Sequence, residues 1–337
     1  MTSIRETLDS FERAELQAVY TPIEHLARLS DQLGIDLWIK RDDLTGLGLG
    51  GNKIRQLEYY FGAALSSGAD TILITGAVQS NYVRSTAAVA AKLGLKTIIQ
   101  LENRVPNESL PYSKSGNVLL GQLLGAEYMY YPDGEDEAGA DKALRARADE
   151  LRAQGRKPYV IPLGLDNKPL GALGYVRAAD EILDQGPEFD AIVVASGSGQ
   201  THSGLLTGLR AFGSKTPVLG ICVRRDAVQQ TARIQSLTTR IADMLGAPEV
   251  ARPEDINVYD GALAPGYGQV GDEVRSAINM MAQNQGLFLD PVYTGKTFAG
   301  LLGLLKDGTI RPDSRVLFIH TGGQPALFAY QEDLSMG

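Results

Sequence analysis

The sequence is poor in the residues that build metal and disulfide sites. Its 337 residues include one cysteine and three histidines, His25, His202 and His320. The single cysteine, Cys222, excludes an intramolecular disulfide, and its apolar neighbours indicate a small buried side chain. Three widely spaced histidines without a cysteine cluster argue against a zinc site built by the protein. The chain is therefore expected to bind no metal and to reside in a reducing compartment, the cytoplasm.

Basic runs and long apolar stretches are also missing. Lys and Arg number 32 against 40 Asp and Glu, which gives a formal net charge of -8. Because no local concentration of positive charge compensates this excess, a nucleic-acid partner is not expected. The N-terminal segment mixes charged and apolar residues and lacks the uninterrupted apolar run of a signal peptide or membrane span. A membrane is therefore not expected as a partner either.

Glycine, in contrast, is abundant, and segments with strand and helix patterns alternate along the chain. There are 38 glycines without a fixed period, in a chain that is 44% hydrophobic and 21% charged. Apolar β-branched runs alternate with helix-periodic segments, which predicts an α/β fold with a mainly parallel sheet covered by helices. The predicted strands are 37–40, 71–75, 97–101, 128–131, 159–162, 191–195, 218–223, 257–259 and 315–320. The predicted helices are 81–93, 137–152, 173–183, 229–245 and 273–285.

Four glycine-bearing turns follow predicted strands, which is where open α/β sheets bind ligands. One of them places Gly197, Ser198, Gly199 and Thr201 between a strand and a helix. Backbone N–H groups and hydroxyls at such a position favour an anion such as phosphate, although many strand-to-helix turns bind nothing. The turn matches neither GxxxxGK[ST] nor GxGxxG, and no acidic ribose partner accompanies it. A nucleotide-dependent oxidoreductase is therefore disfavoured.

The second turn, Gly-Leu-Gly-Gly-Asn52-Lys53, places a lysine in the first turn of a predicted helix, with Asn52 as its expected cap. The positive end of a helix dipole disfavours a cation, so it lowers the pKa of an amine and makes the amine a nucleophile. A solvated lysine is the structural alternative. Ser80 and Asn81 in the third turn, and Thr321 in the fourth, have capping and ordinary turn roles as their alternatives.

Together the four turns resemble those of a known family. The chain contains, in order between about Thr21 and Tyr330, the segments TPIEHLARLS, IKRDD, GGNK, GAVQSN, GALGYV, APGYG, DPVYTGK and HTGG. They are similar to the motifs of the pyridoxal-phosphate (PLP) enzymes related to D-cysteine desulfhydrase and 1-aminocyclopropane-1-carboxylate (ACC) deaminase. The resemblance implies the tryptophan-synthase-β-like fold, called fold type II. It also implies a large lobe from residues 1–53 and 166–337, a small lobe from residues 54–165, and a homodimer.

The same resemblance assigns residues to the cofactor. Lys53 would hold PLP covalently and, once released, take the Cα proton of the substrate. Asn81 would donate a hydrogen bond to the phenolic oxygen of PLP, and Thr294 or Thr321 would face its pyridine nitrogen. The residues implied to bind the phosphate are Gly197, Ser198, Gly199, Gln200 and Thr201.

The resemblance also assigns residues to an amino-acid substrate. Its carboxylate would bind to Ser80, Asn81 and Tyr82 at a helix N-terminus, with Ser80 also counted as catalytic. Tyr267 and Tyr293 would line the substrate pocket and donate a proton to the leaving group. The implied reaction is β-elimination with deamination, which converts a β-substituted alanine into a 2-oxo acid and ammonia.

Position 294 distinguishes relatives within this family. ACC deaminases carry a glutamate there that keeps the pyridine nitrogen protonated, and a threonine cannot hold that proton as an anion does. The residues therefore favour elimination of a good leaving group, as in a D-cysteine desulfhydrase, over ACC deamination. An L-cysteate sulfo-lyase, which releases sulfite, stays open because the added cation Lys168 would suit an anionic substrate, although Lys168 is equally a solvated loop residue. The departures from the desulfhydrases are at Tyr82, Gln200, Ser203 and Gln324.

A non-catalytic binding protein of the same fold is the alternative from another functional class. Such a protein is expected to have lost the reactive lysine, whereas Lys53 is retained in an intact GGNK. A protein that stays colourless after PLP is added would support this alternative over an enzyme.

Overall fold

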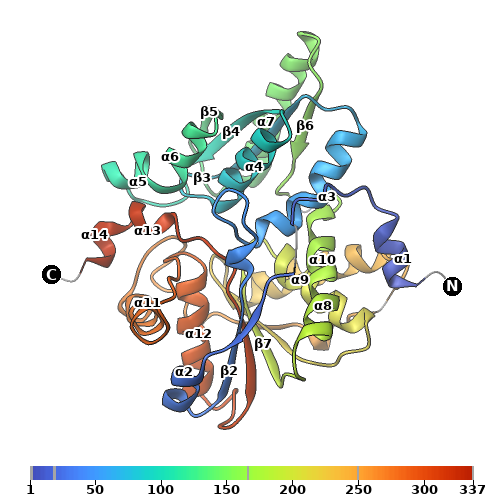
Figure 1. Cartoon of the computed structure of the whole chain (residues 1–337). Helices are drawn as coiled ribbons and strands as arrows, with labels where there is room; N and C mark the ends of the chain where they lie inside the picture. Colours follow the sequence, from blue (N-terminus) through green and yellow to red (C-terminus); the bar gives the residue numbers. More distant parts are fainter. Residues whose placement is uncertain (1–2, 18–19, 165–166, 249, 336–337) are drawn as a thin grey trace.

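The computed structural model describes residues 3–17, 20–164, 167–248 and 250–335, and it has an α/β architecture built on two sheets (Figure 1). Every strand pair is parallel except β1 with β2, which is antiparallel. The six-stranded sheet has the order β1 (Ile23–His25), β2 (Asp36–Lys40), β10 (Arg315–Ile319), β7 (Ala191–Ser196), β8 (Val218–Cys222) and β9 (Asn257–Tyr259). The four-stranded sheet has the order β5 (Glu127–Tyr131), β4 (Lys96–Glu102), β3 (Thr71–Ala77) and β6 (Pro158–Ile161).

Helices accompany both sheets. Those between the strands of the small sheet, or just before it, are α3 (Lys53–Ser66), α4 (Asn81–Lys92), α5 (Leu110–Lys114), α6 (Gly116–Leu123) and α7 (Glu137–Ala153). The others are α1 (Ile4–Asp9), α2 (Ala27–Leu33), α8 (Leu173–Gln185), α9 (Gln200–Ala211), α10 (Ala227–Met244), α11 (Asp272–Gln285), α12 (Thr294–Lys306), α13 (Ala326–Ala329) and α14 (Gln331–Leu334). Short 3₁₀ helices are η1 (Asp42–Leu44), η2 (Leu170–Ala172) and η3 (Pro253–Asp255).

The central strands are apolar on both faces because helices cover both sides of the large sheet. Val193 of β7 and Phe318 of β10 belong to one buried cluster, while their neighbours Ile192 and Leu317 belong to another. Successive side chains of a strand point to opposite faces, so these two clusters lie on opposite sides of the sheet. In the small sheet, β3 is also covered on both faces, because Ile72 and Leu73 belong to two different buried clusters, and β3 is buried along its whole length.

The predicted architecture is confirmed. All nine predicted strands are present, with ends shifted by at most two residues, and the five predicted helices correspond to α4, α7, α8, α10 and α11. The prediction omitted β1, since a three-residue edge strand shows too few residues for a period. The small sheet comes from residues 71–161 and the large sheet from both chain ends. The lobe boundary between residues 165 and 166 lies outside the described residues and stays a prediction.

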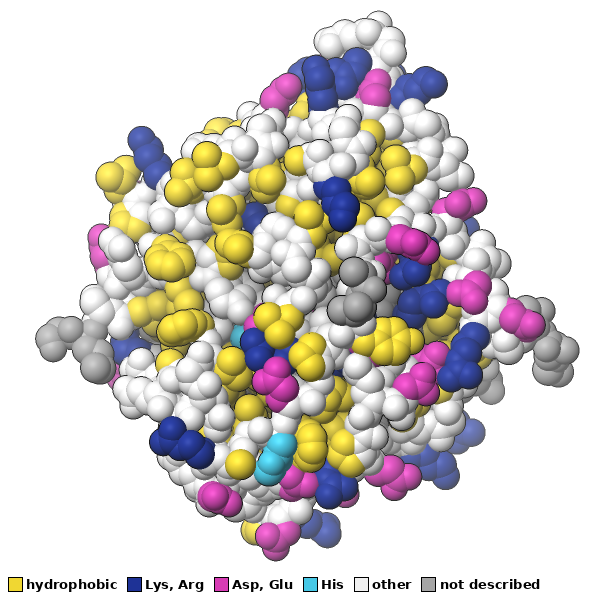
Figure 2. Space-filling model, viewed as in Figure 1, with side chains coloured by type: hydrophobic (Ala, Val, Ile, Leu, Met, Phe, Trp, Pro, Cys, Tyr) yellow, Lys and Arg dark blue, Asp and Glu magenta, His cyan; other side chains and the backbone are white. Residues whose placement is uncertain are grey.

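The surface and the lone cysteine add three observations. Basic and acidic side chains lie interspersed over the face shown in Figure 2. Within the described part of the chain, no helix has the length and apolar character needed to cross a membrane. Cys222 is buried, and that burial raises the pKa of its thiol to about 12, so the thiol stays protonated at neutral pH.

Candidate active site

A cleft lies where the carboxyl ends of β3 and β7 and the segment after β10 come together. It encloses about 900 Å³, its open mouth included. Eleven of the residues assigned from sequence line this one cleft: Lys53, Ser80, Asn81, Tyr82, Gly197, Ser198, Gly199, Thr201, Tyr267, Tyr293 and Thr321. Residues from all four glycine-bearing turns therefore converge, as expected for the carboxyl edge of parallel sheets.

Lys53 is the reactive amine of this cleft. It is the first residue of α3, and its Nζ lies 5.1 Å from the centre of the Tyr82 ring. Desolvation by the surrounding protein lowers the pKa of Lys53 to about 8. A substantial share of the amine is therefore neutral near physiological pH, which is the form that attacks a carbonyl carbon.

In the protein without bound cofactor, acetylation of Lys53 should reach half its maximum near pH 8 and level off above it. At pH 7, an amine with a pKa of 8 has a neutral share about 300-fold larger than one with the ordinary pKa of 10.5. Competitive labelling with acetic anhydride, read by mass spectrometry against free Nα-acetyl-lysine, measures this profile. A midpoint at pH 10 or above would show that burial does not activate the amine.

The residue before the lysine reaches across the cleft and does not cap its helix, which corrects the prediction for Asn52. Asn52 has helical backbone angles and no capping hydrogen bond to α3. Its Nδ2 donates to Thr201 Oγ1 at 2.9 Å, and Gln56 Nε2 donates to the same oxygen at 2.8 Å. Since these donors occupy both lone pairs of the hydroxyl, Thr201 must direct its own proton elsewhere, and it lines the cleft.

The turn after β7 offers an anion several donors. Gly199 adopts a φ of 96°, and a Cβ at this position would lie 2.6 Å from Leu237 Cδ1. Glycine is therefore required for the turn that aims the free N–H groups of α9 at the cleft. The positive end of the helix dipole and the Thr201 hydroxyl proton also favour a negatively charged group at the start of α9. The donor set fits a phosphate group at the start of α9.

The N-terminus of α4 supplies a second group of donors. Ser80 caps this helix, because its Oγ accepts from the backbone N–H groups of Tyr82 (3.2 Å) and Val83 (3.4 Å). The expected capping role of Ser80 is thus present, and its hydroxyl proton is left to donate into the cleft. Asn81 Oδ1 accepts from Asn117 Nδ2 at 2.9 Å, which leaves the Asn81 amide N–H groups as donors.

Two buried residues that the sequence analysis did not identify hold these donors in place. Asn117 Oδ1 accepts from Arg84 Nε at 3.1 Å, and Arg84 Nη1 donates to the carbonyl oxygens of Gly48 and of Gly50, the latter at 3.0 Å. Arg84 therefore ties α4 to the glycine turn before Lys53. Burial lowers the pKa of its guanidinium to about 10. Their contacts join segments distant in sequence, so no local motif marks either residue.

Tyr267 and Tyr293 form a hydroxyl pair in the cleft. Their Oη atoms are 2.7 Å apart, and the rings meet edge to face with centroids 6.2 Å apart. Burial raises the pKa of Tyr293 well above its ordinary value, so the hydroxyl is protonated at neutral pH. One hydroxyl proton joins the two oxygens and the other is free for a ligand.

Neighbouring polar residues fix the position of this pair. Lys296 Nζ donates to the carbonyl oxygens of Leu263 (2.7 Å) and Gly266 (2.5 Å), in the loop that leads to Tyr267. Asp290 accepts from the backbone N–H of Tyr293 at 3.0 Å. Lys296 is the last residue of the DPVYTGK motif, so the motif contains this lysine, but the motif alone does not indicate that the lysine positions Tyr267.

Five residues singled out from sequence do not line the cleft, among them Ser203, whose Oγ donates to the Gly199 carbonyl oxygen at 2.8 Å. Thr294 Oγ1 donates to Asp290 Oδ1 at 2.8 Å and accepts from the Asp290 N–H, so it does not face a cofactor ring. The Gln200 side chain contacts Tyr60. Lys168 is exposed and lines a separate small cavity with Gln200. Gln324 donates to Asp43 at 3.3 Å. These placements correct the expectations that Thr294 faces the pyridine nitrogen and that Lys168 lies at the substrate, while the expectation that the backbone of Gln200 binds the phosphate stays a prediction.

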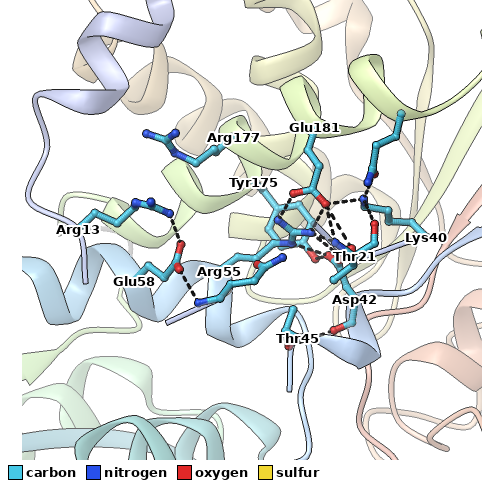
Figure 3. Close-up of polar contacts among 12 residues, drawn as sticks. Arg13, Thr21, Lys40, Asp42, Thr45, Arg55, Glu58, Tyr175, Arg177 and Glu181 are labelled. Carbon is cyan, nitrogen blue, oxygen red and sulfur yellow. Dashed lines mark hydrogen bonds and ion pairs between the residues drawn. The ribbon is translucent and has the colours of Figure 1, made fainter. Parts of the chain in front are cut away.

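A buried ionic network anchors the helix that carries Lys53 (Figure 3). Arg55 of α3 donates to Asp42 Oδ1 at 2.9 Å and to Glu181 Oε2 of α8 at 2.7 Å. Lys40, at the end of β2, donates to Glu181 Oε1 at 2.6 Å. Tyr175 of α8 donates to Asp42. The network therefore joins β2, α3 and α8 directly beneath the first turn of α3 and fixes where Lys53 enters the cleft.

Comparisons with known proteins find similar sequences along almost the whole chain. A family model described as pyridoxal-phosphate dependent enzyme matches residues 15–322. D-cysteine desulfhydrase of Yersinia enterocolitica (serotype O:8, biotype 1B) is 44% identical over 331 residues, which cover 97% of this chain and 98% of the relative. D-cysteine desulfhydrase of Serratia proteamaculans (strain 568) is 43% identical over 332 residues, which cover 97% of this chain and 98% of the relative.

Two solved structures are similar to this chain over almost its whole length. The crystal structure of an ACC deaminase homologue matches with a TM-score of 0.88 and 42% identity, covering 99% of this chain and 98% of the other. An O-ureido-L-serine synthase matches with a TM-score of 0.64 and 20% identity, covering 100% of this chain and 97% of the other. The second likeness concerns the fold alone.

Proposed function

Because this chain belongs to the family of pyridoxal-phosphate-dependent enzymes, we propose that it is a β-eliminating, deaminating carbon-sulfur lyase of the D-cysteine desulfhydrase type. Such an enzyme converts cysteine into a 2-oxo acid, ammonia and sulfide. One observation carries the proposal: the activated amine of Lys53 shares its cleft with a phosphate-binding turn, a helix N-terminus and a tyrosine pair. The full-length relatives named D-cysteine desulfhydrase support it.

The cleft fits PLP by the chemistry of its donors. The start of α9 and the Thr201 proton suit the phosphate, and the free amide N–H groups of Asn81 suit the phenolic oxygen. When bound, PLP withdraws electrons from the Cα of an amino acid. Lys53 supplies the amine that holds the cofactor and, once free, the base that takes the Cα proton.

The N-terminus of α4 orients the substrate. The Ser80 hydroxyl, the backbone N–H of Asn81 and the positive end of the dipole of this twelve-residue helix form a site for the substrate carboxylate, whereas the N–H groups of Tyr82 and Val83 bind Ser80 Oγ. Holding the carboxylate there fixes the direction of the Cα–H bond relative to Lys53. The substrate therefore does not have to rotate before the proton is transferred. Asn117 and Arg84 act as positioning residues, because they contact Asn81 and the turn before Lys53.

Two features favour elimination of a good leaving group over ACC ring opening. Thr321, and not Thr294, lines the cleft, and a threonine hydroxyl cannot hold a proton on the pyridine nitrogen as a carboxylate does. The free proton of the Tyr267–Tyr293 pair is available to the group that departs from Cβ. A neutral hydroxyl pair suits a thiolate, which leaves with little assistance.

A substrate screen tests the proposal. The purified protein, saturated with PLP, is incubated with D- and L-cysteine, cysteate, β-chloroalanine, serine and ACC, and the 2-oxo acid, ammonia, sulfide and sulfite are measured. We expect cysteine and β-chloroalanine to be converted and ACC to be converted slowly or not at all. Faster turnover of ACC than of every β-thio or β-sulfo alanine would contradict the assignment.

The resemblance to the desulfhydrases also supports a cytoplasmic homodimer as part of the proposal. Light scattering coupled to size-exclusion chromatography measures the mass in solution, for which the monomer value is 36.2 kDa. A mass of one chain would contradict the dimer without affecting the proposed chemistry.

A further inference from the structure

One wall of the cleft is lined by arginines that the proposed elimination of sulfide does not need. Arg104, Arg224 and Arg233 line this wall together with Glu137. Arg104 follows β4, Arg224 follows β8, and Arg233 lies on α10, so the three arginines come from three separate parts of the fold. They carry the same charge, and the fold brings them to one surface.

The wall carries more positive than negative charge. Glu137 is shared by three guanidiniums, those of Arg224 (2.7 Å), Arg225 (2.6 Å) and Arg233 (3.5 Å). Arg104 pairs with the buried Glu102 at 2.6 Å. Four guanidiniums therefore meet two carboxylates within the wall, apart from the exposed Glu135 near Arg224. An oxyanion entering the cleft would balance this excess.

Arg104 is the arginine with a donor to spare. Its Nε and Nη2 both contact Glu102 Oε2, and its Nη1 has no hydrogen-bond partner among the described residues. Only 9% of the side chain is exposed, and the residue lines the cleft. A largely buried guanidinium whose Nη1 has no partner is a group with which proteins bind oxyanions such as phosphate.

The position of Arg104 indicates which part of a ligand it would meet. Arg104 lines the cleft together with Tyr267 and Tyr293, and its neighbour Val105 belongs to the buried cluster against which both tyrosines pack. These are the tyrosines placed at the leaving group of the proposed reaction. Arg225 and Arg233 instead donate to the carbonyl oxygens of Gly197 and Ser198, in the phosphate-binding turn. The wall therefore runs from the phosphate side to the leaving-group side, with Arg104 at the latter.

Arg224 lies beside Arg104 through a shared neighbour. Arg224 Nη2 donates to the Gly134 carbonyl oxygen at 3.1 Å. Gly134 packs on Arg104 so closely that a Cβ there would lie 2.5 Å from the Arg104 Cα. Gly134 therefore contacts the backbone of Arg104 and the guanidinium of Arg224, and both arginines line the cleft, where two guanidiniums suit a group with several equivalent oxygens.

We propose that Arg104, supported by Arg224, extends the substrates of this enzyme to amino acids whose Cβ carries a tetrahedral oxyanion, with cysteate as the simplest carbon-sulfur substrate. This inference rests on the proposed β-elimination and specifies its substrate class. With cysteate, the Cα–H and Cβ–S bonds break and sulfur keeps the bonding electron pair. With one water, the products are pyruvate, ammonium and hydrogen sulfite. Lys168, the cation first considered for such a substrate, is exposed outside the cleft.

Arg104→Met tests the inference against the wild type. We measure kcat and KM for D- and L-cysteate, S-sulfocysteine, O-phosphoserine, cysteine and β-chloroalanine. The variant should lower kcat/KM by about 10- to 100-fold for the oxyanionic substrates, because a charged hydrogen bond is lost. It should change kcat/KM by less than about 3-fold for β-chloroalanine, which has no oxygen for Arg104 to bind. Arg152→Met, at an exposed position of α7, is the matched control.

Removal of Arg104 leaves the buried Glu102 without a cationic partner and with the Thr75 hydroxyl as its remaining side-chain donor, so a second design protects the fold. Glu102→Gln combined with Arg104→Met removes both charges, and Glu102→Gln alone isolates the effect of the carboxylate. Arg104→Lys keeps the charge but loses the planar fork, and its effect should be intermediate. A binding measurement accompanies the kinetics: 3-phosphonoalanine should bind the wild type about 10- to 100-fold more tightly than the double variant in calorimetry.

The outcomes separate this inference from the proposed function. A wild type that converts cysteine or β-chloroalanine but neither binds 3-phosphonoalanine nor eliminates sulfite, thiosulfate or phosphate would overturn the inference alone. So would a variant that loses PLP affinity while its preference among substrates stays unchanged, since the wall would then serve the cofactor phosphate. A PLP-saturated wild type that converts no β-substituted alanine would overturn the proposed function itself.

Discussion

Lys53→Ala should lower kcat/KM by at least about 10⁴-fold, because one substitution removes both the covalent anchor of PLP and the base that takes the Cα proton. The release of 2-oxo acid and ammonia measures turnover. The protein should also lose the yellow colour that borohydride bleaches in the wild type. The pocket itself should persist, since Lys53 makes no hydrogen bond that the fold depends on among its described contacts.

Lys92→Ala is the matched control for this experiment. Lys92 is exposed at the C-terminal end of α4, so its removal should leave both colour and turnover unchanged. A Lys53→Ala protein that stays yellow, bleaches with borohydride and keeps more than about 1% of wild-type turnover would assign the amine to another lysine. Lys296, whose pKa burial also lowers to about 8, would then be the next residue to substitute.

Arg55→Met should lower the free energy of unfolding by about 3 to 5 kcal/mol, because it leaves two buried carboxylates with one remaining cation. In the wild type, Arg55 pairs with Asp42 at 2.9 Å and with Glu181 at 2.7 Å, and all three side chains are at most 5% exposed. Urea unfolding followed by circular dichroism measures the loss. Arg55→Lys keeps the charge but loses the planar fork, so its free energy of unfolding should lie between those of the wild type and Arg55→Met. The free energy of unfolding of Arg152→Met should match that of the wild type.

The pH dependence of this deficit gives an independent check. Burial alone would raise the pKa of Asp42, and Arg55 beside it brings that pKa below its ordinary value of 3.8. A carboxylate with a depressed pKa in the folded state stabilises the fold above its unfolded pKa and loses that effect as pH falls. Without Arg55, Asp42 takes up its proton at higher pH. The deficit of Arg55→Met should therefore be largest near pH 7 and should shrink toward pH 4, whereas a constant deficit would point to lost packing.

The fold was predictable from sequence because its signals are local. β3 and β7 are apolar runs of six or seven residues that end in glycine or serine turns, and such runs mark buried parallel strands. Helix α4 follows its Ser80 cap with an alanine-rich segment. Strand β1 was not predicted, because it is only three residues long and is defined by its pairing with β2.

The site was predictable where backbone geometry demands a residue type, and not where side chains meet across the chain. Gly199 and Lys53 lie in turns that the residues next to them in the sequence predict. Asn52 looked like a helix cap, yet its amide binds Thr201, which is 149 positions away. Arg104 gave no signal at all, because a single arginine after a strand is ordinary until the fold places two more beside it.

The network under α3 restricts how this sequence can diverge. Lys40, Arg55, Asp42 and Glu181 form a buried group with no net charge, so replacing one member leaves an uncompensated charge in the interior. A second replacement of opposite sign restores neutrality and costs less than the first, which makes the four positions epistatic. Relatives that have changed this group are therefore expected to have changed it in pairs. A variant library that samples these positions one at a time would discard combinations that fold.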